Sequence, residues 1–216
     1  MSVIRVPLWG VVLVGLAPHS ASAQSERPAP PPVPWGVSAS ASSFKTHAEW
    51  FPKMAAAGVT TVRLFPEWRS LEPTKNTWKW DQSDALVKAA ADNKIEINAI
   101  LMGSPPGTKA LHAFPMDNLN DWSNYVTTVV KRYKNSIRYW EVWNEGNGGF
   151  NDGRHTTADY AKLAVTTYQA VKKADPQARV GLTVASFDPA YLNQTILAMK
   201  KLGAPQFVRF PLYSPV

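Results

Sequence analysis

Apolar positions follow two alternating spacings along the chain from residue 35 onward. Short runs rich in Val, Ile and aromatic residues are typical of buried strands, and they fall at 35–39, 60–65, 95–102, 137–143 and 179–185. Between these runs, apolar residues recur every three or four positions, which predicts helices at 47–57, 82–93, 119–134, 157–174 and 190–202. Strands that alternate with helices predict an α/β fold with right-handed βαβ units and a parallel sheet.

The predicted strands show no clean polar alternation, as expected for a sheet whose two faces are both covered. Two architectures fit this pattern, a doubly wound open sheet and a (β/α)8 barrel (TIM barrel), and the periodicity does not choose between them. No G-x-G-x-x-G motif or phosphate-binding loop follows the first predicted strand. The main indication of a nucleotide-binding open sheet is therefore missing.

The N-terminal residues carry a different pattern. Arg5 precedes an apolar stretch at 6–17, and Ala21-Ser22-Ala23 matches the small-x-small cleavage site of a secretory signal peptide. We therefore expect a signal peptide at 1–23, a Pro-rich linker at 24–34, a folded domain at 35–216, and a secreted (extracellular or periplasmic) protein. The apolar stretch is shorter than the roughly 20 residues of a transmembrane helix, so no membrane partner is expected.

Composition and charge narrow the range of partners. The chain has no cysteine, and its four histidines are scattered without metal-ligand spacing, so we expect neither disulfides nor a metal or other cofactor. The net charge is +7, but the basic clusters at 131–134, 172–173 and 200–201 fall in the last turns of predicted helices, where cations complement the helix dipole. With no recognition motif beside this charge, no nucleic-acid partner is expected.

The stretch YWEVWNEGN at 139–147 places Glu145 at the carboxyl end of a predicted strand. In parallel α/β folds this end of the sheet carries the functional residues. Trp140 and Trp143 precede Glu145, and apolar surroundings favour the protonated carboxyl group that a general acid needs. The glycine-rich loop at 146–149 would let a ligand approach closely. From these residues alone, Glu145 could be either a catalytic acid or a residue that caps or pairs at a strand end.

The motif YWEVWNE resembles the fourth-strand motif of clan A glycoside hydrolases. The segment GVTTVRLFPEWRSLEPTKNTWKWDQSDALVKAA at 58–90 resembles the second strand and helix of the cellulase-like, β-xylosidase-like and β-galactosidase-like members. The resemblance covers about residues 35–200. It implies a TIM-barrel catalytic domain and retaining O-glycosyl hydrolysis of a β-linked polysaccharide or oligosaccharide.

The resemblance also implies roles for individual residues. Glu145 matches the general acid/base, Asn144 the residue that binds the sugar 2-hydroxyl, and Arg63 the arginine that orients the nucleophile. Trp68 follows the second strand and is a candidate for stacking on a sugar, with plain packing as the alternative. Trp78 and Trp80 are expected to pack their loop onto the barrel, and Glu67 and Glu72 to face solvent or brace that loop.

Retaining hydrolysis needs a second carboxylate about 5–5.5 Å from the first. Glu141 lies four residues before Glu145 on the same predicted strand, which separates their backbones by about 13 Å. Asp188 remains as a local candidate, whereas the resemblance implies a nucleophile on the seventh strand. A complete barrel takes about 250 residues, and this sequence holds five units and a sixth strand at 205–216.

We therefore expect a TIM barrel truncated after about five βα units, without its nucleophile. A non-catalytic carbohydrate-binding remnant or inactive fragment is the alternative function. A basic extracellular binding module is a further alternative function.

Overall fold

A computed structural model describes residues 35–39, 46–109, 112–152 and 155–204. The chain divides into two units, Met1–Val33 and Pro34–Val216, and the described residues all belong to the second. The expected signal peptide, the whole of the Pro-rich linker and the expected sixth strand at 205–216 lie outside the described residues.

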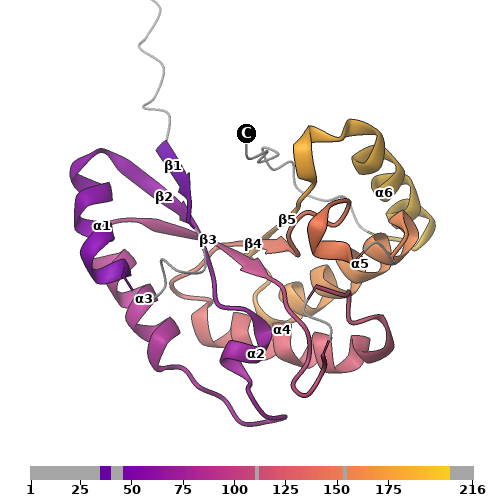
Figure 1. The fold of residues 1–216 in the computed structure, drawn as a ribbon, viewed down its shortest axis with the longest axis horizontal. Helices are drawn as coiled ribbons and strands as arrows, with labels where there is room; N and C mark the ends of the chain where they lie inside the picture. Colours follow the sequence, from indigo (N-terminus) through magenta and orange to yellow (C-terminus); the bar gives the residue numbers. More distant parts are fainter. Residues whose placement is uncertain (1–34, 40–45, 110–111, 153–154, 205–216) are drawn as a thin grey trace, which may run out of the picture. The chain divides into compact units, whose positions relative to one another are not determined.

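The described part contains a five-stranded parallel sheet in which each strand pairs with the next one along the chain (Figure 1). The strands are β1 (Trp35–Ser38), β2 (Val59–Arg63), β3 (Glu96–Leu101), β4 (Tyr139–Val142) and β5 (Arg179–Leu182). A doubly wound sheet reverses its strand order at a switch point, whereas a TIM barrel keeps the order of the chain. The observed order therefore favours the barrel arrangement.

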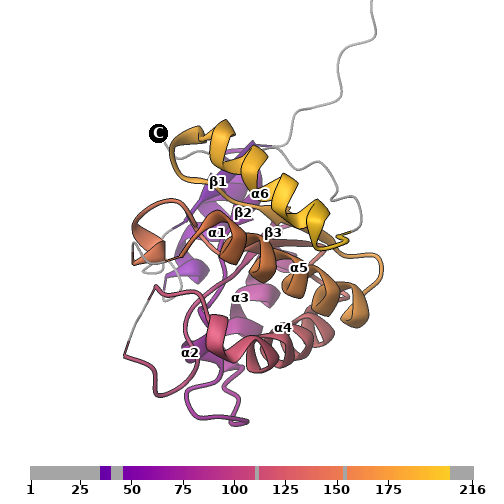
Figure 2. The same cartoon turned by 90° about the vertical axis from the view of Figure 1, so that its right-hand side faces the viewer.

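Helices follow the strands and lie in an arc around one side of the sheet (Figure 1). They are α1 (His47–Ala56), α2 (Trp68–Leu71), α3 (Asp81–Asp92), α4 (Leu119–Tyr133), α5 (Thr157–Ala174) and α6 (Pro189–Lys201), with 3-10 turns at Met116–Asn118, Gly149–Asn151 and Ala185–Phe187. Seen from the side, α4, α5 and α6 lie next to one another in chain order (Figure 2). The amphipathic pattern of the sequence explains this layer, because α3, α4 and α5 bury their apolar faces. The outer helices α1 and α6 leave Trp50, Ile196 and Leu197 exposed.

The two faces of the sheet differ in polarity. Val62, Ile97 and Trp140 point to one face and are completely or almost completely buried in the core. The neighbouring positions Arg63 and Glu141 point to the other face, which is polar. Both faces are covered at these positions of β2 and β4, as expected, but one of the two faces carries polar side chains.

Several helix ends follow the signals in the sequence. Gly58 and Gly203 follow α1 and α6 with φ of +83° and +69°, a conformation that glycine adopts without strain. Basic residues occupy the last turns of α4, α5 and α6, as expected from their spacing. None of the described helices is long and apolar enough to cross a membrane.

Candidate active site

A buried ion pair lies between the ends of β2 and β4 on the polar face of the sheet. Arg63 is the last residue of β2, and its Nε donates to Oε2 of Glu141 over 2.6 Å. The two side chains are only 11% and 9% exposed. Because the pair is largely removed from water, each charge depends on the other for its stability.

Asn98 of β3 completes the environment of Glu141. The strand register places Asn98 beside Arg63, and its Nδ2 donates to Oε1 of Glu141. Both oxygens of the carboxylate therefore have a partner. The Oδ1 atom of Asn98 is buried and has no hydrogen-bond partner among the described residues.

Arg63 also fixes the orientation of Asn144. Its Nη2 donates to Oδ1 of Asn144 over 2.9 Å. Since the amide oxygen faces the guanidinium, the Nδ2 group of Asn144 is the end that can donate to a ligand. Asn144 is partly exposed.

Glu145 lies in a turn with unusual backbone geometry. Trp143 and Glu145 have φ of +64° and +47°, in the left-handed region that costs about 1–3 kcal/mol for residues other than glycine. Trp143 is held in place because its N–H donates to the Leu101 carbonyl over 2.8 Å and its indole donates to the Phe150 carbonyl over 2.6 Å. This turn leaves Glu145 half-buried immediately beyond the strand end, while the expected neighbour Trp140 is turned into the core.

The loop that follows Glu145 is tied to the loop after β5. Asn147 accepts the Ala185 N–H at its Oδ1 over 2.6 Å, and its Nδ2 lies 3.3 Å from Oδ2 of Asp188. Asp188 also caps α6, because its Oδ1 accepts the N–H of Tyr191 over 2.9 Å. Both oxygens of Asp188 therefore serve the local structure.

The glycines of this loop allow close packing within the protein. A Cβ atom at Gly146 would lie 3.1 Å from Tyr160, 3.2 Å from Phe114 and 3.2 Å from the Tyr191 hydroxyl. At Gly148 a Cβ atom would lie 3.0 Å from the Ala185 Cβ. Packing against protein, rather than the approach of a ligand, accounts for glycine at these two positions.

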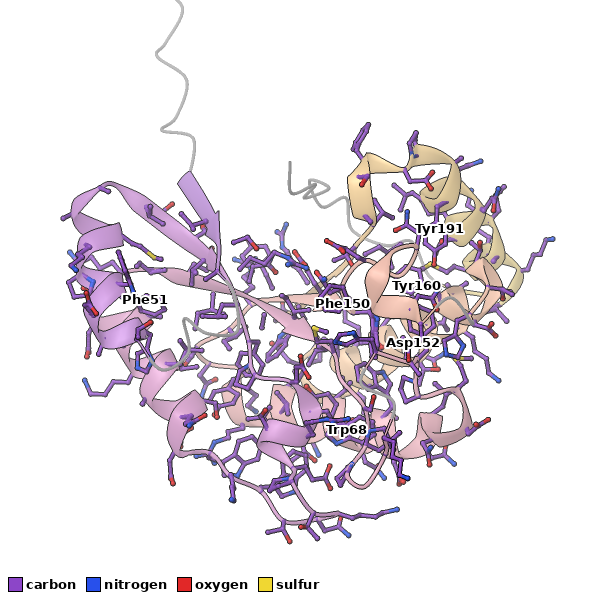
Figure 3. All side chains as sticks on the ribbon, viewed as in Figure 1. Phe51, Trp68, Phe150, Asp152, Tyr160 and Tyr191 are labelled. Carbon is purple, nitrogen blue, oxygen red and sulfur yellow. The ribbon has the colours of Figure 1, made fainter. Side chains whose placement is uncertain are left out.

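Tyr160 of α5 joins the ends of β4 and β5. Its hydroxyl donates to the Val142 carbonyl over 2.9 Å and accepts the Thr183 N–H over 2.9 Å. Burial raises the pKa of Tyr160 to about 12, so the hydroxyl keeps its proton at neutral pH. Tyr160 lies next to Tyr191 of α6, with 5.8 Å between the ring centroids (Figure 3).

Trp68 does not have the role expected for it. Its side chain is 1% exposed, its ring stacks on Tyr125 with 5.0 Å between centroids, and its indole N–H donates to Glu72 over 2.6 Å. Stacking on a sugar needs an open ring face, so this expectation is wrong and the packing alternative is correct. The indole belongs to the core because α2 directs it inward.

Three other residues of the β2–α3 loop, Trp78, Trp80 and Glu72, match their expected roles. Trp78 and Trp80 stack on each other with 4.9 Å between centroids and pack against the core. Glu72 is buried and accepts the Asn76 N–H over 2.6 Å, so it braces the loop, while Glu67 is half-buried. Within the described ranges, no group of three or more His, Asp or Glu residues could hold a metal ion.

Asn98, Asn147 and Tyr160 were not predicted from the sequence, and Glu141 was considered only as a catalytic partner. A polar residue inside an apolar strand was the available signal for Asn98 and Glu141. Asn147 and Tyr160 gave no such signal, because their contacts depend on how α5 and the β5–α6 loop pack.

Comparison with known proteins identifies the family of this chain. The family model described as glycosyl hydrolase family 10 matches residues 54–183, which is more than half of the chain. The chain belongs to glycosyl hydrolase family 10. This membership confirms the resemblance to clan A glycoside hydrolases and places the chain among O-glycosyl hydrolases.

Curated relatives of this family 10 chain include fungal and bacterial enzymes. Endo-1,4-beta-xylanase 3 of Hypocrea jecorina is 30% identical over 145 residues, which cover 63% of this chain and 41% of the relative. Endo-1,4-beta-xylanase A of Xylanibacter ruminicola is 26% identical over 152 residues, covering 62% and 40%. The chain thus spans about two fifths of the length of these relatives.

Solved structures support the fold of the family 10 chain. The GH39 enzyme from Xanthomonas axonopodis pv. citri matches with a TM-score of 0.64 and 18% identity, over 80% of this chain and 38% of that one. A monomeric beta-xylosidase from Caulobacter crescentus CB15 matches with a TM-score of 0.63 and 20% identity, over 80% and 40%. At this identity the likeness shows a shared fold and no more.

Proposed function

We propose that this protein is a secreted glycoside hydrolase of β-1,4-linked xylan in which Glu145 is the general acid/base. The geometry at the end of β4 carries the proposal. Glu145 is half-exposed immediately after Asn144, and Arg63 turns the amide donor of Asn144 toward an incoming ligand. The two curated xylanases suggest the sugar.

Each residue has a defined part in this mechanism. Glu145 gives its proton to the glycosidic oxygen as the bond to the leaving group breaks. Asn144 donates from Nδ2 to the 2-hydroxyl oxygen of the sugar, a contact that strengthens in the transition state. Arg63 is a positioning residue, since it acts on the sugar through Asn144.

We expect the second carboxylate of a retaining mechanism to come from neither of the two local candidates. Glu141 is engaged by Arg63 and Asn98, and Asp188 by Asn147 and the first turn of α6, so each already has a structural role. Of the 16 acidic residues in the sequence, only Glu26 lies outside the described residues. We therefore expect the 216-residue chain to have an acid/base but no nucleophile of its own, which also supports the alternative of a carbohydrate-binding protein without turnover.

Rescue by a small anion tests this assignment. Azide can attack the anomeric carbon from the face opposite the leaving group, while Glu145 protonates the departing oxygen, so that an alcohol and an α-xylobiosyl azide form. We expect phenyl β-xylobioside to give this azide with the full chain, and little hydrolysis without added anion. The Glu145→Gln variant should lose about 10²–10⁴-fold of the azide reaction, the usual contribution of acid catalysis.

The leaving group supplies the control. Dinitrophenolate departs without protonation, so Glu145→Gln should change the reaction of dinitrophenyl β-xylobioside far less than that of the phenyl substrate. A Glu49→Gln variant, altered on the exposed face of α1, should behave as the parent with both substrates. Equal losses on both substrates would remove the assignment of Glu145 as the general acid. A covalent 2-fluoro-xylobiosyl adduct on Glu141 or Asp188 would show that the chain has a nucleophile of its own.

Secretion is tested separately. We propose that residues 1–23 are removed as a signal peptide and that the mature chain begins at Gln24. N-terminal sequencing of protein from the culture medium or periplasm should begin at or near Gln24. Exported protein that retains Met1 would contradict this processing.

A further inference from the structure

The charges of the described unit are divided between the two ends of the parallel sheet. In a parallel arrangement each helix begins beyond the carboxyl end of one strand and ends just before the next strand begins. The segments that lead from α3, α4 and α5 into β3, β4 and β5 therefore lie together at the amino end of the sheet, opposite the end that carries Glu145. These segments are 91–96, 131–139 and 171–179.

The amino end of the sheet is strongly basic. Its three segments hold eight lysine and arginine residues and three carboxylates. The basic residues, which we call the basic end, are Lys94, Lys131, Arg132, Lys134, Arg138, Lys172, Lys173 and Arg179. The carboxylates are Asp92, Glu96 and Asp175.

The basic end is open to solvent, and little of its charge is neutralised. Lys94, Lys134 and Arg138 are exposed. Backbone pairing holds two of its segments together, since the Arg179 N–H donates to the Arg138 carbonyl over 2.8 Å. Of the eight basic residues, Arg132 alone forms an ion pair with a described carboxylate.

The helix dipole explains only part of this charge. The ion pairs Arg132–Asp84 and Lys88–Asp92 each bring in one further charge, of opposite sign, so the excess at this end remains five positive charges. A helix C-terminus carries roughly half a negative charge, so α3, α4 and α5 together supply about 1.5. More than three positive charges are therefore left without a counter-charge in the described unit.

The end of the sheet that carries Glu145 has the opposite charge. Its described loops and first helical turns, within 64–84, 102–121, 143–159 and 183–192, hold ten carboxylates and four lysine or arginine residues. Asp81, Asp121 and Asp159 lie in first turns of helices, where carboxylates complement the dipole. A polyanion is therefore attracted to the basic end and repelled from the end around Glu145.

The composition of the basic end favours one class of polyanion. Single-stranded nucleic acids bind through aromatic rings on which the bases stack, in addition to positive charge. The three segments contain no tryptophan or phenylalanine, while Tyr133 is buried and Tyr139 half-buried. A polymer of carboxylate groups needs only accessible positive charges, and in a chain of glycosyl hydrolase family 10 a carbohydrate polymer is the expected partner.

We propose that the basic end docks the protein on a polysaccharide that carries uronate carboxylates. The choice of a polysaccharide rests on the proposed function, whereas the attraction to a polyanion follows from the charges alone. Because the two ends of the sheet differ in charge, docking turns the end around Glu145 away from the acidic polymer. That end stays accessible to a neutral chain while the protein is held in place.

Titration of the full chain with fluorescently labelled polygalacturonate tests the docking. We expect binding at about 10 mM salt, where charges act over about 30 Å, and loss of binding at about 1 M, where they act over about 3 Å. The double variant Lys134→Gln/Arg138→Gln should bind about tenfold more weakly at low salt. Lys79→Gln/Lys109→Gln is the matched control, because it removes two charges from exposed positions at the other end of the sheet and should bind as the parent does.

The proposal is overturned if the parent does not bind polygalacturonate, or if the two double variants, both folded by circular dichroism, are weakened equally. Equal weakening would mean that net charge alone causes the binding. Tighter binding of a DNA duplex or of anionic lipid vesicles at equal charge concentration would likewise overturn it, since the partner would belong to another class.

The Glu145→Gln variant separates this proposal from the proposed function. It should bind polygalacturonate as the parent does, even if the azide reaction shows that the catalytic role of Glu145 is wrong. In the parent, bound polygalacturonate should leave the azide reaction of phenyl β-xylobioside unchanged. Inhibition of that reaction would place the polymer at the end around Glu145 and contradict the orientation proposed for docking.

Discussion

Arg63 contacts two side chains that belong to different parts of the proposed site. Its Nε binds Glu141 and its Nη2 binds Asn144, so the charge that is stabilised inside the sheet also orients the amide beside Glu145. Asn98 holds the other oxygen of Glu141. The structural ion pair and the orientation of Asn144 therefore depend on the same guanidinium group.

Glu141→Gln should lower the free energy of unfolding by about 3 kcal/mol, because it leaves the largely buried Arg63 without its counter-charge. Urea unfolding at neutral pH measures the loss. Glu49→Gln, which breaks the exposed Lys53–Glu49 pair, serves as the control and should change stability by less than about 0.5 kcal/mol. A similar loss in both variants would show that burial of the pair has no energetic importance.

Gly146→Ala should destabilise the fold by about 1–3 kcal/mol, because its methyl group would press on Tyr160, Phe114 and the Tyr191 hydroxyl. Gly149→Ala is the matched control, since nothing lies within 4 Å of a Cβ atom there. Thermal unfolding of the two variants gives the comparison. If both variants have the melting temperature of the parent, the loop after β4 can accommodate the added methyl group without loss of stability.

At the scale of elements, the hydrophobic pattern predicted every strand and every long helix in the described ranges. The helix predicted at 157–174 coincides with α5, whose start is fixed by a capping box between Thr156 and Asp159. The strands are shorter than predicted, and β4 ends at Val142 because Trp143 turns into the left-handed region. The four-residue α2 was not predicted, since it is too short to show a periodicity.

The capping box of α5 should make part of the stability depend on acid. The Thr156 N–H donates to the Asp159 carboxylate, which is the main reason that the pKa of Asp159 is lowered. Because the folded-state pKa lies below the unfolded value, this stabilisation is complete above the unfolded pKa and is lost as the pH falls through the folded one.

Asp159→Asn should therefore cost about 1 kcal/mol at neutral pH, and the difference from the parent should shrink when both are unfolded in urea near pH 3. Asp152→Asn, an exposed change just before the helix, should show no such pH dependence. A pH-independent difference for Asp159→Asn would indicate that the loss comes from packing rather than from the charge.

At the scale of the whole described unit, the sequence left two architectures open and the strand order decided between them. The residues at the strand ends were found from the motif, but their partners were not. Which side chains meet across β2, β3 and β4 depends on register, and register follows from packing that a single sequence does not display. Trp68 was misassigned for the same reason, since the direction of a short helix decides whether its tryptophan faces the core or the ligand.

The sequential order of the strands has a consequence for how the chain acquires its structure. Asn98 pairs with Tyr139, and Tyr139 pairs with Arg179, so each strand meets a neighbour that has already been synthesised. No described strand waits for a more distant segment, which keeps the entropy of loop closure small at every step. We expect nascent chains stalled on the ribosome to gain protease resistance in steps, one as each helix emerges behind its strand. Resistance that appears only after α6 has emerged would show that the units assemble all at once.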